Sequence, residues 1–310
     1  MNTTAMQNNL GVNRTLVVVT CYRDLNQLSV LFKSVNLYLE PSNIIIVVNE
    51  DDDMKWLVWY DRHKILPQHN VEIIFKNDLF PASSHSMESY NDGWFTQQIL
   101  KLIIATKVVT PEYVLLDTKN FFIKPTSLVD IKQMQAADYF KSIGRDIVWV
   151  SAVASKLTTP LTKLISARGG LFLSDASTPY VINTSYAERL ISHFGGLEQF
   201  VNWFLTTTES LRVCETTGSV DHELTVFISE FYLYELFCTL ELGVDYTDCI
   251  KINNATFWPD GPLSRDYIDS CIDNMLDDVY VGGLHYRSIL AMSSDDVRHV
   301  YHRFGLLDSA

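Results

Sequence analysis

Residues 113–120 read YVLLDTKN, and this stretch decides the fold expected for the chain. Its first four residues are apolar and are typical of a buried β-strand, which ends abruptly on Asp117. Residues 93–109, just before it, have the apolar spacing of a helix that Thr110 and Pro111 would end. Ligands bind at the carboxyl ends of the strands in open α/β sheets, so we expect Asp117 to face a ligand. The alternative is that Asp117 only caps the following turn.

Three further apolar segments, residues 16–20, 44–48 and 71–75, also have the character of buried strands. An amphipathic helix is expected between the first two, over residues 25–39. Strands that alternate with helices, and are too apolar for a one-faced sheet, predict an α/β fold with a parallel sheet and right-handed crossovers. The loops after the first two strands should therefore lie at the same edge as Asp117.

Polar residues in the loops after the first two strands are candidates for binding a nucleotide. An aromatic ring can stack on a base, a carboxylate can bind base or ribose, and a cation can bind phosphate. These candidates are Thr20, Tyr22, Arg23, Asp24 and Asn49. The acidic run at residues 50–53 either joins them or is a solvated turn. The chain has neither a G-x-G-x-x-G after the first strand nor a P-loop motif, which argues against a classical dinucleotide fold or a P-loop enzyme.

The composition favours a folded, acidic protein without a nucleic-acid partner. Hydrophobic residues make up 47% of the 310 residues and charged residues 20%, which allows a large core. The formal net charge of −13 does not suit nucleic-acid binding, which normally requires a basic face. Positive charge for an anionic ligand would therefore have to be local. Its candidate sources are Arg23, Lys101, Lys119 and Arg168.

The sequence predicts a cytoplasmic protein, with room for a protein partner or a position at the inner face of the membrane. The five cysteines form no C-x-x-C pair, which suits a reducing compartment and offers neither a zinc site nor a disulfide framework. The first residues do not have the pattern of a signal peptide, and no apolar run reaches the length of a transmembrane span. Residues 1–14 are expected to be a flexible tail and residues 15–310 a single domain.

Two residues in the second half of the chain are candidates for a chemical role. Glu230 is expected among aromatic side chains on a helix over residues 229–237. Apolar surroundings raise the pKa of a carboxylate, as a general base requires, although a helix dipole also favours a glutamate at a helix N-terminus. His285 follows two glycines, and it is a metal ligand, a phosphate donor or a structural residue.

Three motifs resemble those of GT-A type nucleotide-sugar glycosyltransferases, and more narrowly those of a little-characterised bacterial group of glycosyltransferase-like proteins. They are W-x-x-Q-Q-x-x-K-L at residues 94–102, an L-D-x-D-x-x-F-x-x-P-like turn at residues 116–125, and S-E-F-x-x-Y at residues 229–234. The resemblance extends from residue 15 to about residue 290. It implies a single GT-A-like α/β domain with a mostly parallel central sheet flanked by helices. Its donor half would be at about 15–125 and its acceptor half at about 126–310.

One residue departs from the family pattern. Where the pattern has a second acid two residues after Asp117, this chain has Lys119. In GT-A enzymes those acids hold a divalent ion that binds the donor diphosphate, and Mg²⁺ or Mn²⁺ suits such a site. A protonated lysine cannot ligate a metal, so in one hypothesis the enzyme is metal-independent and Lys119 itself stabilises the diphosphate. In the other hypothesis Asp117 and Asn120, with His285, hold a weakened metal site.

The resemblance implies a glycosyltransferase that moves a sugar from an activated, nucleotide-linked donor to a saccharide or lipid-linked acceptor in bacterial surface-polysaccharide synthesis. Asp117, Lys119 and Glu230 would be catalytic, and Glu230 would activate the acceptor hydroxyl if the reaction inverts the anomeric carbon. The alternatives are a nucleotidyl- or phosphoryl-transferase, and an inactive relative that only binds a saccharide or a partner protein.

The remaining candidate residues belong to the donor side of the implied site. Asn120 would bind near the diphosphate. Gln97, Gln98 and Lys101 would lie on the helix beneath the site, where the two glutamines would hydrogen-bond to sugar or to the Asp117 loop, or would only pack the helix against the sheet. Plain packing is the role expected for Trp94.

Overall fold

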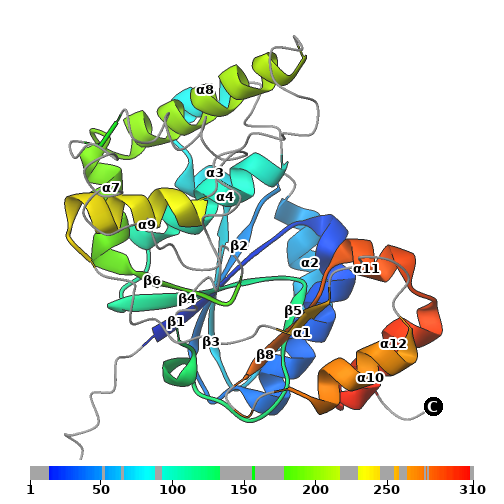
Figure 1. Cartoon of the computed structure of the whole chain (residues 1–310). Helices are drawn as coiled ribbons and strands as arrows, with labels where there is room; N and C mark the ends of the chain where they lie inside the picture. Colours follow the sequence, from blue (N-terminus) through cyan, green and yellow to red (C-terminus); the bar gives the residue numbers. More distant parts are fainter. Residues whose placement is uncertain are drawn as a thin grey trace, which may run out of the picture.

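The centre of the fold is a five-stranded, mostly parallel sheet with the strand order β3-β2-β1-β4-β6 (Figure 1). The strands are β1 (Arg14–Thr20), β2 (Asn43–Val48), β3 (Asn70–Phe75), β4 (Glu112–Asp117) and β6 (Tyr180–Asn183). β1 to β4 pair in parallel, and β6 pairs antiparallel with β4. The four strands that the apolar segments predicted are therefore confirmed.

The computed structural model describes the greater part of the chain. The described residues are 14–50, 53–63, 66–87, 93–132, 156–157, 178–216, 230–244, 255–257, 264–275, 277 and 279–307. Arg168, one of the predicted sources of positive charge, lies outside them.

The register brings the carboxyl ends of the parallel strands together. Val19 in β1 lies opposite both Val47 in β2 and Asp117 in β4. Val47 in turn lies opposite Ile74 in β3. The loops after these four strands therefore begin at one edge of the sheet, as the sequence predicted for β1, β2 and β4.

Helices cover both faces of this sheet, which explains why its strands are continuous apolar runs (Figure 1). Leu16 and Val18 of β1 pack with α1 (Leu25–Tyr38) and α2 (Asp53–His63). Val17 and Val19 point to the opposite face and pack with a second group of helices. That group comprises α4 (Gly93–Ile103), α7 (Thr184–His193), α8 (Leu197–Thr216) and α9 (Glu230–Glu241). The result is a mixed α/β fold with a mostly parallel central sheet between two helical layers.

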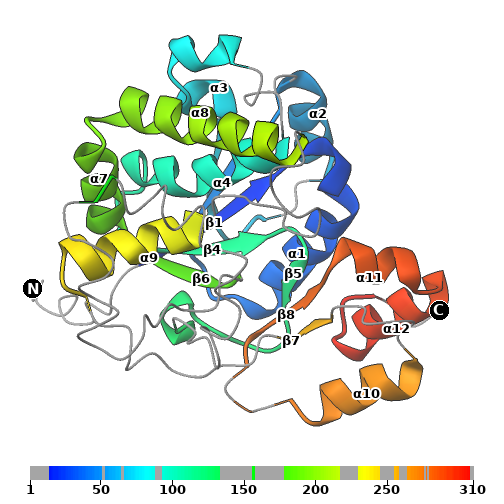
Figure 2. The same cartoon turned by 45° about the horizontal axis from the view of Figure 1, so that its top comes forward.

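A second, three-stranded sheet of order β5-β8-β7 continues from the end of β4. Its strands are β5 (Asn120–Phe122), β7 (Ala255–Phe257) and β8 (Val281–Leu284). Beside it lie α10 (Arg265–Asp273), α11 (Tyr286–Ala291) and α12 (Ser294–Arg303) (Figure 2). Gly282 lies against the ring of Phe121, and a Cβ at this position would be only 3.0 Å from that ring. A side chain at this position would have to displace the Phe121 ring slightly, so the close approach of β5 to β8 favours a glycine.

Short helices complete the described part of the chain. They are η1 (Tyr22–Asp24), α3 (Lys76–Leu79), η2 (Ala82–Ser86), η4 (Ile104–Thr106) and η5 (Leu128–Asp130). Every described helix is too short or too polar to cross a membrane.

The predicted boundary of the N-terminal tail is one residue too late. Arg14 belongs to β1, and its guanidinium forms an ion pair with Glu112 of β4 at 2.7 Å. This pair fixes the start of the sheet, because the neighbouring strands β1 and β4 each supply one partner. The rest of the predicted tail, residues 1–13, lies outside the described residues.

Candidate active site

A cavity of about 1030 Å³ opens at the carboxyl ends of β1 to β4, where the sequence predicted a ligand. This volume is at the upper end of the roughly 300–1,000 Å³ typical of small-molecule sites. The lining residues come from the loops after the four strands, from α1, α2 and α4, and from the residue after β8. They are Thr20, Cys21, Tyr22, Arg23, Asp24, Gln27, Asn49, Glu50, Lys55, Trp56, Lys76, Gly93, Trp94, Gln97, Asp117, Thr118, Lys119 and His285.

Most of the predicted site residues line this cavity. They are Thr20, Tyr22, Arg23, Asp24, Asn49, Gln97, Asp117, Lys119 and His285. Four predicted residues do not line it: Gln98, Lys101, Asn120 and Glu230. All four are buried behind the wall, where they contact one another or the turn after β4. The sheet-edge rule locates the first group, whereas the second group depends on how α4 and α9 pack.

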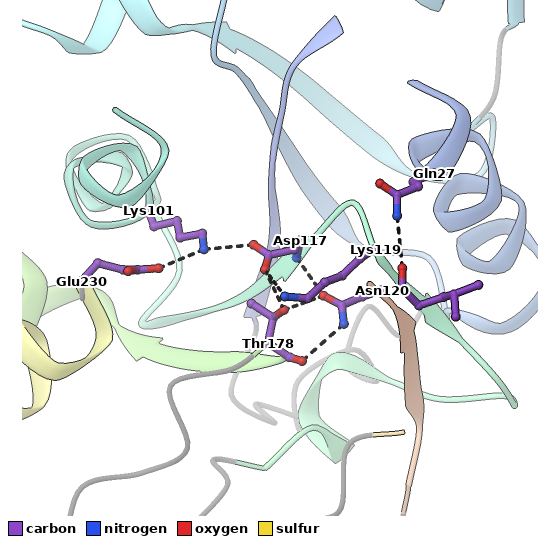
Figure 3. Close-up of polar contacts among 8 residues, drawn as sticks. Gln27, Lys101, Asp117, Lys119, Asn120, Thr178 and Glu230 are labelled. Atoms are coloured by element: carbon purple, nitrogen blue, oxygen red, sulfur yellow. Dashed lines mark hydrogen bonds and ion pairs between the residues drawn. The ribbon is translucent and has the colours of Figure 1, made fainter. Parts of the chain in front are cut away.

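A buried chain of ion pairs lies directly behind the cavity (Figure 3). The Lys101 ammonium of α4 lies 2.9 Å from Oδ1 of Asp117 and 2.9 Å from Oε1 of Glu230. The Lys119 ammonium lies 2.9 Å from Oδ2 of Asp117. Lys101 is 4% exposed and Glu230 2% exposed, so both charges depend on their partners. These ion pairs join α4, the end of β4 and the start of α9 at one point.

The charged groups of these buried ion pairs stabilise one another. Burial alone would raise the pKa of Asp117, but the ammonium groups of Lys101 and Lys119 lower it far below its usual value. Burial alone would lower the pKa of Lys101, but Asp117 and Glu230 raise it above its usual value. Burial raises the pKa of Glu230, although the Lys101 ammonium opposes that shift. Asp117 and Lys101 are therefore both charged at neutral pH.

The position of Glu230 corrects its predicted role. The pKa is raised, as a general base requires, but the carboxylate is buried, pairs with Lys101 and does not line the cavity. In the orientation that satisfies its hydrogen bonds, the Gln98 amide also donates to this carboxylate. Glu230 therefore pairs with Lys101 behind the wall and does not line the cavity. Gln98 and Lys101 are likewise buried and do not line it.

Asn120 lies at the turn after β4 (Figure 3) and does not line the cavity. Its Oδ1 accepts hydrogen bonds from the Asp117 backbone N–H at 2.9 Å and from the Thr178 hydroxyl at 2.6 Å. Its Nδ2 donates to the Thr178 carbonyl at 3.3 Å. The side chain is therefore buried with both ends engaged and does not line the cavity, so a role in supporting the turn fits its position better than the predicted role in donor or metal binding.

The second sheet brings His285 to the cavity. The Leu284 backbone N–H donates to the Lys119 carbonyl at 2.9 Å, and the Gln27 amide donates to the Leu284 carbonyl at 3.1 Å (Figure 3). These bonds tie the end of β8 to the turn after β4 and to α1. His285 is therefore placed beside Lys119 on the cavity wall.

The residues that the D-x-D pattern would use do not fit a divalent ion. Each carboxylate oxygen of Asp117 faces an ammonium group, and the Asn120 oxygen already accepts two hydrogen bonds. Among the described residues, no three His, Cys, Asp or Glu side chains come together as metal ligands. Mg²⁺ and Mn²⁺ require several oxygen ligands, so this arrangement favours cationic side chains over a metal.

The described cavity lining has a small excess of positive charge, although the chain carries a net charge of −13. Four cationic side chains line it, against three carboxylates. They are Arg23, Lys55, Lys76 and Lys119 against Asp24, Glu50 and Asp117. Lys55 and Lys76 were not predicted. Lys76 directly follows β3, so the rule that identified the loops after β1 and β2 could have found it, whereas Lys55 within α2 gives no such signal.

The loops after β1 and β2 are connected to each other and to α4. The Tyr22 backbone N–H donates to Glu50 Oε1 at 3.0 Å, which shows that Glu50 belongs to the site. The Asn49 amide donates to the Gly93 carbonyl at 2.6 Å and accepts from the Thr96 hydroxyl at 2.8 Å. The N-terminal end of α4 is therefore fixed to the end of β2.

Trp94 and Asp24 also line the wall. Trp94, expected to pack α4 against the sheet, is 43% exposed and lines the cavity. Asp24 is largely buried beside Cys21 and Thr118, and burial raises the pKa of its carboxyl above the usual value. Burial also raises the pKa of the Cys21 thiol to about 11, so this cysteine is a neutral thiol at pH 7.

Comparisons with known proteins find solved structures of low similarity and one matching family. No curated protein matches the chain. The apo glycosyltransferase GlyE of Streptococcus pneumoniae TIGR4 is 12% identical with a TM-score of 0.42; the match covers 96% of this chain and 61% of that one. Apo mouse xyloside xylosyltransferase 1 is also 12% identical, with a TM-score of 0.37 and coverage of 88% and 97%. Galactosyltransferase LgtC, in complex with donor and acceptor sugar analogs, is 12% identical, with a TM-score of 0.41 and coverage of 96% and 97%.

These TM-scores are all below 0.5, too low to establish a shared fold, and the chain spans only 61% of the length of GlyE. The family comparison is stronger, because it covers more than half of the chain. A family model described as "Family of unknown function (DUF6492)" matches residues 15–249, and the chain therefore belongs to that family.

Proposed function

We propose that the protein is a glycosyltransferase that moves a sugar from a nucleotide-linked donor to a saccharide or lipid-linked acceptor without a metal ion. The observation that carries this proposal is the Lys119 ammonium, which lies on the cavity wall at the end of β4 and is held 2.9 Å from Asp117. In this position it can neutralise the charge that develops on a leaving diphosphate.

The buried ion pairs give Lys119 a fixed position. Asp117 holds the Lys119 ammonium through one carboxylate oxygen, and Lys101 holds Asp117 through the other. Glu230 in turn fixes Lys101. A cation that is already oriented before the reaction stabilises developing charge without a cost of reorganisation. Asp117, Lys101 and Glu230 act in this mechanism as positioning residues.

The donor nucleotide is proposed to lie across the ends of β1 and β2. The exposed ring of Tyr22 suits stacking against a base, and Arg23 suits contact with a phosphate. The sequence resemblance to GT-A enzymes supports the same orientation, with the diphosphate at the turn after β4. A role in bacterial surface-polysaccharide synthesis, on the cytoplasmic side of the membrane, is proposed from that resemblance alone.

The test is nucleotide release from a panel of UDP-, GDP-, CMP- and dTDP-linked sugars, each with Mn²⁺ and with EDTA. The expected result is release of one nucleotide at similar rates in both conditions, because Lys119 takes the place of the metal. Release only with Mn²⁺ would contradict metal independence. Transfer of the nucleoside monophosphate with release of a sugar 1-phosphate would identify a nucleotidyltransferase. Binding without any release would identify an inactive saccharide-binding relative.

A further inference from the structure

One face of α4 leads from the mouth of the cavity to the buried ion pairs. Trp94, Gln97 and Lys101 are spaced by three and four residues, so they lie on the same side of the helix. Trp94 is 43% exposed and Gln97 is half-buried, and both line the cavity, whereas Lys101 is buried against Asp117. Seven residues of helix separate the first from the last, which corresponds to about 10 Å along the axis.

The indole of Trp94 is held at this wall. Its ring packs edge-on against Phe95, with 5.0 Å between the ring centroids. The turn of helix that carries it is fixed by the hydrogen bonds of Asn49 to Gly93 and to Thr96. A large apolar ring on a polar cavity wall leaves apolar area in water, and an aromatic ring at such a position is suited to a ligand with an apolar face.

We infer that Trp94 and Gln97 form a saccharide subsite, in which a pyranose ring stacks on the indole and its hydroxyls hydrogen-bond to the Gln97 amide. A pyranose has an apolar C–H face and a rim of hydroxyls, which matches this pair of side chains. Neither side chain is charged, so the subsite suits a neutral sugar.

This inference deepens the proposed function, on which its place in the reaction rests, but sugar binding itself does not require turnover. The pyranose could belong to the donor or to the acceptor. The two sources differ in one respect that can be measured. A donor sugar contributes to the affinity of a nucleotide sugar over that of the bare nucleotide, whereas an acceptor sugar binds as a simple glycoside.

The test is saturation-transfer NMR and calorimetry on the full chain. The probes are methyl β-D-galactopyranoside, methyl α-D-glucopyranoside and methyl β-N-acetylglucosaminide, together with UDP, GDP, CMP, dTDP and their sugar-linked forms. The variants are Trp94→Ala, Trp94→Phe and Gln97→Ala. Tyr267→Ala is the matched control, because Tyr267 is an exposed aromatic residue on α10 outside the cavity lining.

The expected result is that Trp94→Ala weakens the binding of at least one sugar probe about tenfold, while Trp94→Phe and the control retain most of it. Loss confined to the glycosides assigns the subsite to the acceptor, and loss confined to nucleotide sugars assigns it to the donor. Equal loss for sugar-linked and bare nucleotides would overturn the inference, because the indole would then bind the base. Absence of any sugar binding by the wild type would also overturn it. Sugar binding that depends on Trp94, without turnover of any donor, would support the subsite and refute the proposed transfer.

Discussion

The ammonium of Lys119 lies 2.9 Å from the carboxylate of Asp117, at the position where the GT-A pattern has a second acid. Relative to the GT-A pattern that the sequence resembles, the chain has a cation on the cavity wall in place of an acid. The same carboxylate is paired from behind by Lys101. Asp117 thus links a buried cation to one that lines the cavity.

Lys119→Met should lower the rate of donor turnover about 100-fold, because the leaving group loses its main source of stabilisation. The affinity for the nucleotide should fall much less, since the base and ribose contacts remain. Steady-state measurement of kcat and KM for the donor checks both statements. Lys107→Met, a change of an exposed lysine after η4, is the matched control and should leave both constants unchanged. A rise in KM with an unchanged kcat would contradict a role for Lys119 in stabilising the transition state.

Lys119→Asp should create the metal dependence that the wild type is proposed to lack. The variant restores two acids at the turn after β4 and removes an ammonium from Asp117, which frees carboxylate oxygens for Mn²⁺. Thermal unfolding with and without Mn²⁺ measures the effect: the variant should gain stability with Mn²⁺, and the wild type should not. Equal stabilisation of both proteins would show that the metal binds elsewhere or that Lys119 does not prevent it.

Lys101→Met should destabilise the fold by about 3–5 kcal/mol, because it leaves the carboxylates of Asp117 and Glu230 buried without their shared cation. Glu230→Gln should cost less, about 1–3 kcal/mol, since Lys101 keeps its pair with Asp117. Urea unfolding compares the two variants with Glu40→Gln, which changes an exposed glutamate. If Glu230→Gln abolished turnover with full stability and full donor binding, Glu230 would act directly on substrate.

The main elements of the fold could be predicted from the sequence because each of them is encoded locally. The strands around Val17 and Leu115 are continuous apolar runs, and both are covered by helices on two faces. The sheet-edge rule then located Asp117 and Lys119 at the cavity. The start of β1 could not be placed at Arg14, because the pair with Glu112 joins residues far apart in the sequence.

The sequence could not predict which site residues line the cavity and which are buried behind its wall. This depends on packing between distant segments. The sequence placed Lys101 and Glu230 near the site, but only the contact of α4 with α9 shows that they pair behind the wall. Trp94 had the spacing of a core residue, yet it lies at the end of its helix, where the apolar face reaches the cavity. Periodicity identifies the face of a helix and not the point along it at which burial ends.

The stability that Asp117 provides should decrease in acid. Its folded pKa lies far below the unfolded value of 3.8, so its contribution is complete above that value and is lost as the pH falls toward the folded pKa. The difference in unfolding free energy between wild type and Asp117→Asn should therefore shrink by about 1 kcal/mol between pH 6 and pH 3. Urea unfolding at several pH values measures it, with Asp61→Asn on the exposed side of α2 as the control. A constant difference across this range would show that the ion pairs do not depress the pKa of Asp117.

Asn120→Ala should destabilise the protein by about 1–3 kcal/mol, because the Asp117 backbone N–H and the Thr178 hydroxyl both lose a buried acceptor. Turnover should fall as well, since the turn that carries Lys119 is no longer held. Asn274→Ala, at the exposed C-terminal end of α10, is the matched control and should change stability by less than about 0.5 kcal/mol. Urea unfolding and donor turnover should therefore change together in Asn120→Ala. A stable variant that had lost only donor affinity would instead return Asn120 to the binding surface.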